Sequence, residues 1–277
     1  MSTASVVIPA HNEARGLRRC LSALLESARP GEFEIVVVAN GCRDETARIA
    51  RSFSVECVET PIASKSRALA LGDDSASVFP RIYLDADVVI STGTARALAS
   101  TLVSESRYLA AAPRMLVPLD GTSPLARAYL SVWRDLPVFR TGYVGSGCYA
   151  LSQAGRSRFE TFPDVIGDDR FINELFEPGE KCTLSDHQLL TVPPRTLRGI
   201  FRRSLRVRAG TTQLRSPGKR VVAEGTRSYL VERAATAREL PNVIVFVVTQ
   251  VVIAGATRVR RALRRDTVWL RDETSRV

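Results

Sequence analysis

Two aspartates that follow a short apolar run are the residues of this chain best suited to chemistry. They lie in the segment Tyr83-Leu84-Asp85-Ala86-Asp87 at spacing i, i+2, so in an extended backbone both carboxylates project from one face. Two oxygen ligands at the carboxyl end of a strand suit a Mg²⁺ or Mn²⁺ ion that also binds phosphate oxygens. The alternative is a strand-end turn with two solvated carboxylates, because the D-x-D pattern is short and common.

A second acidic pair, Asp168-Asp169, stands at the start of a predicted helix. The apolar residues after it recur at helical spacing: Phe171, Ile172, Leu175 and Phe176. One carboxylate can therefore cap the helix while the next points into a cleft and accepts a proton from a reacting hydroxyl. We expect Asp169 to be the base and Asp168 to cap the helix or contact an acceptor. The alternative is that both aspartates only cap the helix.

The elements that must position these acids alternate regularly in the first part of the chain. The predicted strands are Val6–Pro9, Phe33–Ala39, Val55–Val58 and Arg81–Leu84. The predicted helices between them are Glu13–Ser27, Asp44–Arg51 and Ser64–Leu71. Strands that return through helices pair in parallel by right-handed crossovers, so this part is predicted to be doubly wound α/β. In such a sheet, ligands bind at the carboxyl ends of the strands.

The regular alternation of strands and helices ends at about residue 109. Ala110–Val117, Tyr143–Leu151 and Thr183–Val192 are predicted strands, and Pro124–Trp133 and Asp168–Phe176 are predicted helices. We therefore expect an α/β fold with a mixed, mainly parallel central sheet flanked by helices and a C-terminal helical, basic extension. The predicted domains are 1–215, with a first half at about 1–110 and a second at 111–215, and the extension at 216–277.

Charge and cysteine content limit the partners. The chain has 39 Lys+Arg against 29 Asp+Glu, a net charge of +10, which favours an anionic partner such as a nucleotide, a phosphorylated lipid, a membrane surface or nucleic acid. Nine basic residues and no acid lie between Arg195 and Arg220, either as a loop that closes on an anionic ligand or as a solvated basic face. Five cysteines without C-x-x-C spacing and an N-terminus without an apolar leader predict a cytoplasmic protein.

The segment Leu240–Thr257 is the most membrane-like part of the chain. Its 18 residues carry no charge, and arginines follow it directly, so 240–265 is expected either to contact a membrane surface or to dock on the catalytic domain or a second subunit. Polar or helix-weakening residues favour docking: Pro241, Thr249, Gln250 and Gly255. Membrane contact would place the protein at the inner face of the cytoplasmic membrane, and docking on a second subunit would make it a homodimer.

Five segments in register resemble the GT-A glycosyltransferases, specifically the inverting, nucleotide-sugar-dependent enzymes of family 2. They are Val6–Glu13, Val37–Thr46, Ser64–Gly72, Asp85–Asp87 and Gly167–Phe171, and together they cover about residues 5–210. Each motif is weak by itself, but they occur in the family's order. The resemblance implies a GT-A domain, a divalent metal (Mn²⁺ or Mg²⁺) and a donor in which UDP or GDP carries the sugar.

The resemblance also implies roles for individual residues. Asp87 would bind the metal, and Asp85 would bind the ribose or lie in the outer shell of the metal. Residues with a nucleotide-sugar-binding role would be Pro9, Ala10, His11, Glu13, Asn40, Lys65, Arg67, Asp85, Ala86, Asp87 and Gly147. For Glu13 the alternative is a first-turn helix acid, for Lys65 and Arg67 an exposed helix face, and for Gly147 a plain strand-end turn.

Three departures from the family pattern bear on function. Ala39-Asn40 stands where the family usually has an Asp pair, which leaves the nucleotide base open. His187 lies early for the histidine that completes the metal site in many members, and a lone surface histidine is the commoner interpretation. Arg203–Val207 ends in Val where processive synthases have Trp, which favours a single-transfer enzyme.

The predicted function is therefore transfer of one sugar to a hydroxyl acceptor, lipid-linked or anionic. One alternative is a haloacid-dehalogenase-type phosphatase, because Leu84–Val89 resembles its nucleophile motif. That alternative leaves the three preceding strand–helix units unexplained. The other alternative is a non-catalytic basic binding module on a transferase fold.

Overall fold

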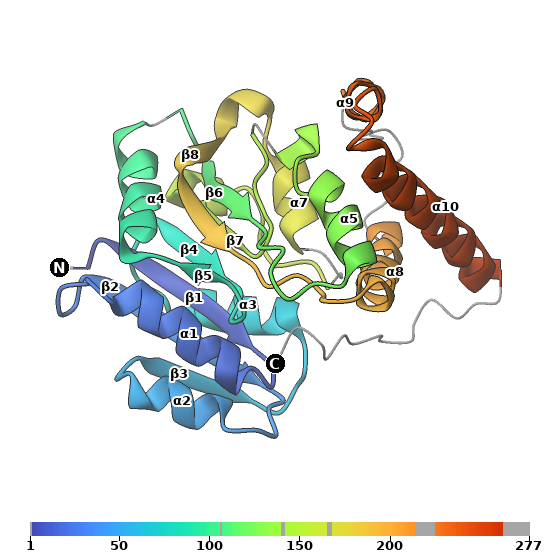
Figure 1. The fold of residues 1–277 in the computed structure, drawn as a ribbon. Coiled ribbons are helices and arrows are strands. Elements are labelled where there is room, and N and C mark those ends of the chain that lie inside the picture. The colour runs from blue at the N-terminus through green and yellow to red at the C-terminus, as the bar shows by residue number, and fades with distance from the viewer. Residues whose placement is uncertain (1, 106, 140–141, 165–167, 214–224, 263–277) are drawn as a thin grey trace. The chain divides into compact units, whose positions relative to one another are not determined.

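The computed structural model describes residues 2–105, 107–139, 142–164, 168–213 and 225–262 (Figure 1). Among these residues, eight strands form one sheet in the order β3-β2-β1-β4-β7-β6-β8-β5. Four neighbouring pairs are parallel (β1–β2, β1–β4, β2–β3 and β6–β8), and three are antiparallel (β4–β7, β6–β7 and β5–β8). The expected mixed, mainly parallel α/β sheet is confirmed.

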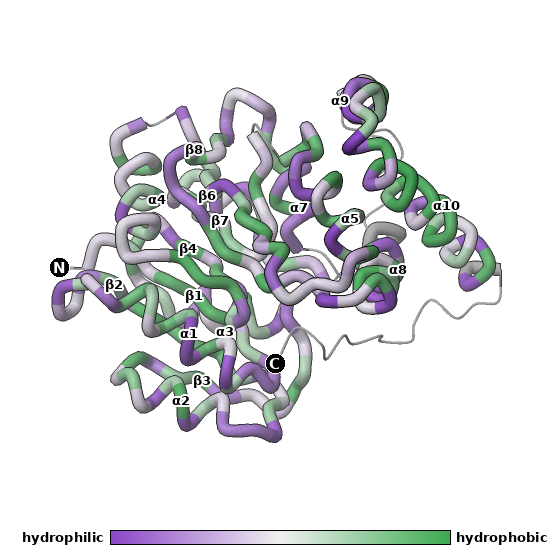
Figure 2. The backbone as a smooth tube through the Cα atoms, viewed as in Figure 1, coloured by the Kyte–Doolittle hydropathy of each residue, from purple (hydrophilic) through white to green (hydrophobic). Residues whose placement is uncertain are grey.

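The first half of the sheet follows the predicted alternation. Its strands are β1 (Ala4–Ala10), β2 (Phe33–Asn40), β3 (Glu56–Thr60) and β4 (Arg81–Leu84), and its helices are α1 (Ala14–Leu25), α2 (Thr46–Ser52) and α3 (Lys65–Ser75). Successive residues of a strand point to opposite faces of the sheet. Val6 of β1 accordingly packs with Leu17 and Leu21 of α1, whereas Val7 packs with Leu69 of α3. Burial on both faces explains why β1 and β2 are mostly apolar (Figure 2).

The second half is less regular, as expected. It contains β5 (Val89–Ile90), α4 (Thr92–Ser104), β6 (Ala110–Leu116), β7 (Cys148–Leu151), α6 (Gln153–Arg156), α7 (Asp168–Leu175), a short 3₁₀ turn (Pro178–Glu180) and β8 (Lys181–Leu190). The strand predicted at Tyr143–Leu151 begins only at Cys148. Gly145, Ser146 and Gly147 all have positive φ angles, so the backbone before Cys148 turns instead of extending.

The described residues form two compact units. Unit 1 comprises residues up to Leu116, Gly142–Asp164 and Asp168–Thr191, and holds the whole sheet; unit 2 comprises Val117–Thr141 and Val192 onward. Helices of unit 2 are α5 (Pro124–Trp133), α8 (Leu197–Gln213), α9 (Thr226–Ala234) and α10 (Leu240–Ala262), with a 3₁₀ turn at Pro137–Phe139. This division differs from the boundary predicted at residue 215, because α10 packs on α5 and α8 from the predicted catalytic domain.

Two predictions for the C-terminal part can be compared with the structure. The stretch Arg195–Arg220 is not a loop through most of its length, because Leu197–Gln213 is helical and buries Ile200 and Leu205. Its residues 214–220 lie outside the described residues, as does 263–265 of the predicted membrane-contact segment. The helical extension is confirmed by α9 and α10. In the described part of the chain, Leu240–Arg260 of α10 is the one helix with the length and apolarity needed to cross a membrane.

Candidate active site

The ammonium of Lys65 joins two acids from different elements. Lys65 is the first residue of α3, Asp85 follows β4 directly, and Asp168 begins α7. Lys65 Nζ lies 2.6 Å from Asp85 Oδ1 and 2.9 Å from Asp168 Oδ1. We call Lys65, Asp85, Asp168 and the adjoining Asp169 the Lys65 cluster. The exposed fractions of the Lys65 and Asp85 side chains, 36% and 31%, leave both within reach of a ligand.

Gly147 connects the two acidic pairs through its backbone. The amide of Asp85 donates to the carbonyl oxygen of Gly147 (2.8 Å), and the amide of Gly147 donates to Asp169 Oδ2 (3.0 Å). Gly147 has φ +87°, and a Cβ there would lie 2.7 Å from Val88 Cγ2 and 3.2 Å from Asp85 Oδ2. Only glycine meets both conditions without strain. Gly147 is therefore at the site, where it sets the distance between the acids.

The charges of the Lys65 cluster are unbalanced in favour of acid. Burial raises the pKa of Asp169 to about 6, and the charge of Asp168 adds to the effect. Burial also raises the pKa of Asp85 to about 7, although Lys65 opposes the shift. Burial alone would lower the pKa of Lys65, but the carboxylates of Asp168, Asp85 and Asp169 raise it well above its ordinary value. Carboxylates with pKa values near neutrality are typical of catalytic sites.

One oxygen of Asp169 lacks a hydrogen-bond partner among the described residues. Oδ1 is buried and makes no hydrogen bond with any described residue, whereas Oδ2 accepts from Gly147. A buried carboxylate oxygen without a donor is costly, and it marks a place where a hydroxyl group could bind. Both aspartates of the pair thus make tertiary contacts, which speaks against the interpretation that they only cap a helix.

Asp87 is exposed and close to the first loop. Between the two acids of the Asp85–Asp87 segment, Ala86 is buried, and the segment lies against Gly16 of α1. A Cβ on Gly16 would lie 3.0 Å from the carbonyl oxygen of Ala86, 3.2 Å from Asp87 Cα and 3.2 Å from Glu13 Oε2. Glu13 and the backbone of Asp87 are therefore neighbours. Sequence reasoning missed Gly16, although a glycine early in a helix beside a predicted site was a usable signal.

The first loop is tied to the end of β2. Asn40 is 3% exposed, and its side-chain amide donates to the carbonyl oxygen of Ala10 (2.9 Å). The ring of His11 in turn contacts the carbonyl oxygen of Asn40. The predicted first-loop residues Pro9, Ala10, His11 and Asn40 thus lie together. In this arrangement the Asn40 amide group fixes the loop and is not turned toward a base.

The amides at the start of α1 are already used. Glu13 N donates to Thr46 Oγ1 (2.9 Å), and Ala14 N donates to Asp44 Oδ2 (3.1 Å). These two donors are therefore not open to a phosphate, although the start of a helix generally favours an anion. Glu13 is the residue before the first turn of α1, and its side chain makes no capping hydrogen bond to the helix.

Two other basic side chains lie apart from the Lys65 cluster. Arg67 is exposed and two residues beyond Lys65 on α3, so the two side chains diverge around the helix axis. His187 lies in β8 where the pairing with β6 jumps from Pro113–Leu184 to Arg114–Gln188, which marks a β-bulge. Within the described part of the chain, no three His, Cys, Asp or Glu side chains group as metal ligands. A divalent ion would therefore need ligands from the donor as well.

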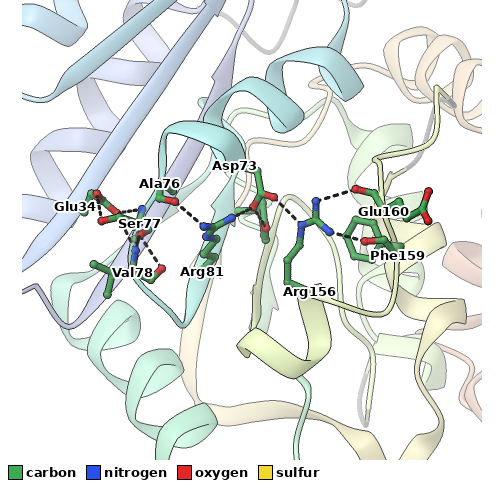
Figure 3. Close-up of polar contacts among 11 residues, drawn as sticks. Glu34, Asp73, Ala76, Ser77, Val78, Arg81, Arg156, Phe159 and Glu160 are labelled. Atoms are coloured by element: carbon green, nitrogen blue, oxygen red, sulfur yellow. Dashed lines mark hydrogen bonds and ion pairs between the residues drawn. The ribbon is translucent and has the colours of Figure 1, made fainter.

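A second ionic group, also missed from sequence, lies between α3 and β4. Asp73 of α3 accepts from Arg81 Nη1 (2.5 Å) and Tyr83 Oη (2.5 Å) of β4, and from Arg156 Nε (2.7 Å) of α6. Figure 3 shows Asp73 between the two arginines. We call these four residues the Asp73 cluster. Because it joins the elements that carry Lys65 and Asp85, it positions the site without taking part in it.

Comparison with known proteins assigns the chain to a family. Residues 5–146 match the model of Glycosyl transferase family 2, which is about half of the chain. The chain belongs to glycosyl transferase family 2. The family 2 match accounts for the strand–helix units before Asp85 that a phosphatase left unexplained, so the phosphatase alternative is set aside.

Individual relatives of this family 2 member are distant or short in overlap. Glycosyltransferase AglE of Haloferax volcanii is 45% identical over 51 residues, which are 18% of this chain and 17% of that protein. The fold is similar to mannosyltransferase PcManGT from Pyrobaculum calidifontis in complex with GDP-Man and Mn²⁺ (TM-score 0.58, 17% identity, 95% of this chain and 79% of that one). It is also similar to glucosyl-3-phosphoglycerate synthase from Mycobacterium tuberculosis in complex with Mg²⁺ and UDP (TM-score 0.54, 18% identity, 76% and 79%).

Proposed function

We propose that this family 2 glycosyltransferase moves one sugar from a UDP- or GDP-linked donor to a hydroxyl acceptor, with inversion at the anomeric carbon. The observation that carries the proposal is Oδ1 of Asp169 in the acid-rich Lys65 cluster, which is buried and has no hydrogen-bond partner among the described residues. PcManGT and the mycobacterial synthase, which share the fold, are in complex with GDP-Man and UDP respectively. Single transfer is favoured by Val207 at the position where processive synthases have Trp.

Asp169 is the proposed base. Its Oδ1 accepts the proton of the acceptor hydroxyl while the acceptor oxygen bonds to the anomeric carbon. The bond from that carbon to the diphosphate breaks, and the nucleoside diphosphate leaves with the electron pair. A pKa of about 6 keeps Asp169 largely ionised at neutral pH, yet basic enough to take a proton. Asp168 holds Lys65 in place and lies next to the acceptor position.

The acids at the end of β4 fit a divalent ion. Asp87 is exposed, and Asp85 uses Oδ1 for Lys65 while its side chain stays 31% exposed, so hard oxygen atoms remain available for Mn²⁺ or Mg²⁺. Asp87 would bind the ion, with Asp85 as a further ligand or in its outer shell, and donor phosphate oxygens would complete the set. When bound, the ion offsets the charge that develops on the leaving diphosphate.

The remaining predicted residues would hold the nucleotide. Glu13 lies beside Asp87 and would face the base and ribose together with the loop Pro9–His11, which Asn40 fixes. Lys65 would exchange part of its contact with Asp85 for the diphosphate. Arg67 would reach the donor only from the outer side of α3. An acceptor that is anionic or lipid-linked would suit the basic chain.

Thermal stabilisation and nucleotide release test the proposal. UDP or GDP should raise the melting temperature only when Mn²⁺ or Mg²⁺ is present, and one sugar from a donor panel should be hydrolysed slowly without any acceptor. Asp87→Asn should remove both effects. Asp74→Asn is the matched control, because Asp74 is an exposed aspartate of unit 1 outside the site and should behave as the parent.

Two outcomes of these experiments would contradict the proposal. A melting temperature that responds to neither nucleotide would favour the binding module on a transferase fold. If Asp87→Asn responded to metal and nucleotide as the parent does, the role of Asp87 would be wrong while the family assignment stood.

A further inference from the structure

Helix α10 has two faces of different character. Its inner face, turned toward α5 and α8 of unit 2, buries Val243, Phe246, Thr249 and Ile253. Its opposite face, which we call the outer face, is aliphatic and exposed, with side chains between 42% and 65% accessible: Leu240, Ile244, Val247, Val248, Val251, Val252 and Val259. From Leu240 to Val252 these positions recur mostly at three- and four-residue intervals, and Val259 follows two helical turns later, so they form a stripe on one side of the helix.

Two polar residues in the middle of α10, Thr249 and Gln250, lie on its inner face. Gln250 donates to Tyr129 Oη (2.9 Å) and accepts from Arg208 Nη2 (2.7 Å). Thr249 is buried as well. In a water-soluble helix the polar face points outward and the apolar face points inward. Thr249 and Gln250, which dilute the apolarity of the segment as a whole, both face the protein, so the outer face keeps its aliphatic residues.

We propose that the outer face of α10 lies in the headgroup–acyl boundary of an anionic membrane leaflet. Aliphatic side chains suit acyl chains, and the stripe ends beside the exposed Arg258, which suits anionic headgroups. A second copy of the chain fits less well, since each copy carries +10 and the stripe contains none of the aromatic or Met residues that enrich protein interfaces. The inference is independent of the proposed activity, because it concerns unit 2 alone.

The helix would lie on the leaflet and not cross it. Crossing would expose to lipid the inner face, where Gln250 bonds to Tyr129 and Arg208. Breaking these bonds in hydrocarbon is unfavourable, because no water replaces them. Surface contact keeps the packing on α5 and immerses only the stripe. In a cytoplasmic protein this places the chain at the inner face of the cytoplasmic membrane.

Vesicle sedimentation with the full chain tests the proposal. The protein should pellet with vesicles of equal parts phosphatidylcholine and phosphatidylglycerol, and bind pure phosphatidylcholine vesicles more weakly. Val248→Asp/Val251→Asp places two charges in the stripe and should weaken binding to the mixed vesicles at least about tenfold. Val103→Asp is the matched control, because Val103 of α4 is 70% exposed outside the stripe and should leave binding unchanged.

Further measurements keep the test decisive. Circular dichroism should show that both variants fold, as expected for exposed positions. Arg258→Glu should weaken binding to the anionic vesicles only. The proposal is overturned if the double variant binds vesicles like the parent, if alkaline carbonate fails to release bound protein, or if the parent is a dimer that the double variant makes monomeric while vesicle binding persists.

Discussion

The two ends of β4 each carry an ionic cluster, and the clusters differ in balance. In the Asp73 cluster both carboxylate oxygens of one acid are used, by Arg81 and Tyr83 on one side and Arg156 on the other. In the Lys65 cluster three carboxylates share one ammonium. One of their oxygens, Oδ1 of Asp169, lacks a hydrogen-bond partner among the described residues. The Asp73 carboxylate has donors on both of its oxygens, although Nε of Arg81 is buried without a hydrogen-bond partner among the described residues. The Lys65 cluster instead leaves a carboxylate oxygen open to a ligand.

The difference between the two clusters shows how the fold keeps the carboxylates of the Lys65 cluster together despite their repulsion. Buried acids of like charge repel, and a site that keeps them together must be held by its surroundings. Here α3 and β4 carry Lys65 and Asp85 at one end and are joined at the other end by Asp73. The loop before β4 is fastened further by Glu34, which accepts from Ser77 Oγ (2.7 Å) and from the amide of Ser77 (2.8 Å) (Figure 3). One cluster therefore supplies rigidity and the other supplies reactivity.

The largest expected effect is on catalysis at the incomplete cluster. Asp169→Asn removes the proposed base, so the rate of sugar transfer should fall by about 10³-fold. The affinity for UDP or GDP with Mn²⁺ should stay within about twofold, because Asp169 is proposed to act on the acceptor. Steady-state transfer and nucleotide titration measure the two quantities. A transfer rate within about tenfold of the parent would show that another group takes the proton.

The next largest effect is on the free energy of unfolding, which should fall more for a variant of the Asp73 cluster than for one of the Lys65 cluster. Asp73→Asn leaves two arginines without their carboxylate, and their side chains are only 11% and 16% exposed, so unfolding free energy should fall by about 3 kcal/mol. Lys65→Met should lower it by only about 1 kcal/mol, since its partners can take up protons and Asp85 is partly exposed. Urea unfolding compares the variants. Equal losses would mean that the Lys65 cluster is structural too.

The third expected effect is a gain in folding stability, not a loss. The folded-state pKa of Asp169, about 6, lies above its ordinary value, so ionising this acid destabilises the folded state as pH rises through that range. Asp169→Asn should therefore stabilise the protein by about 2 kcal/mol near neutral pH. The gain should disappear at about pH 4, where the folded parent is already protonated. Thermal unfolding at both pH values measures it. A variant less stable than the parent at neutral pH would contradict the charge imbalance.

Most of the sheet was predictable because local patterns determine it. The continuous apolar run of β2 and the helical spacing of α1 gave these elements within two residues at each end, and α5 was predicted with its observed bounds. The membership of Asp85, Asp168 and Asp169 in one site followed from the family resemblance and agrees with their shared contacts to Lys65 and Gly147.

The features that were not predicted from the sequence depend on contacts between residues far apart in the chain. Nothing in the sequence links Asp73 to Arg156, which are 83 residues apart. The inward orientation of Gln250 likewise depends on Tyr129, far earlier in the chain. Composition described α10 correctly as apolar but could not say which face its polar residues occupy. The basic stretch that became α8 was misjudged because charge was weighed before the spacing of Ile200 and Leu205.

The smallest expected effect tests how closely α1 holds the Asp85–Asp87 segment. Gly16→Ala adds a Cβ that would lie 3.0 Å from the carbonyl oxygen of Ala86 and 3.2 Å from Asp87 Cα. These are backbone atoms, so the segment must move by a few tenths of an ångström, and metal-dependent nucleotide affinity should fall about threefold. Alanine improves helix propensity by about 1 kcal/mol, which should offset most of the lost packing.

Gly93→Ala provides the matched comparison for that last variant. Gly93 lies in the first turn of α4, and its added Cβ would meet only Ser91 Oγ at 3.7 Å. This variant should gain about 0.5 kcal/mol in stability from reduced chain entropy and should bind nucleotide like the parent. Isothermal titration and urea unfolding of both variants give the contrast. If Gly16→Ala bound nucleotide as tightly as Gly93→Ala does, the Asp85–Asp87 segment would not depend on its contact with α1, and the position of Asp87 would have to be set by β4 alone.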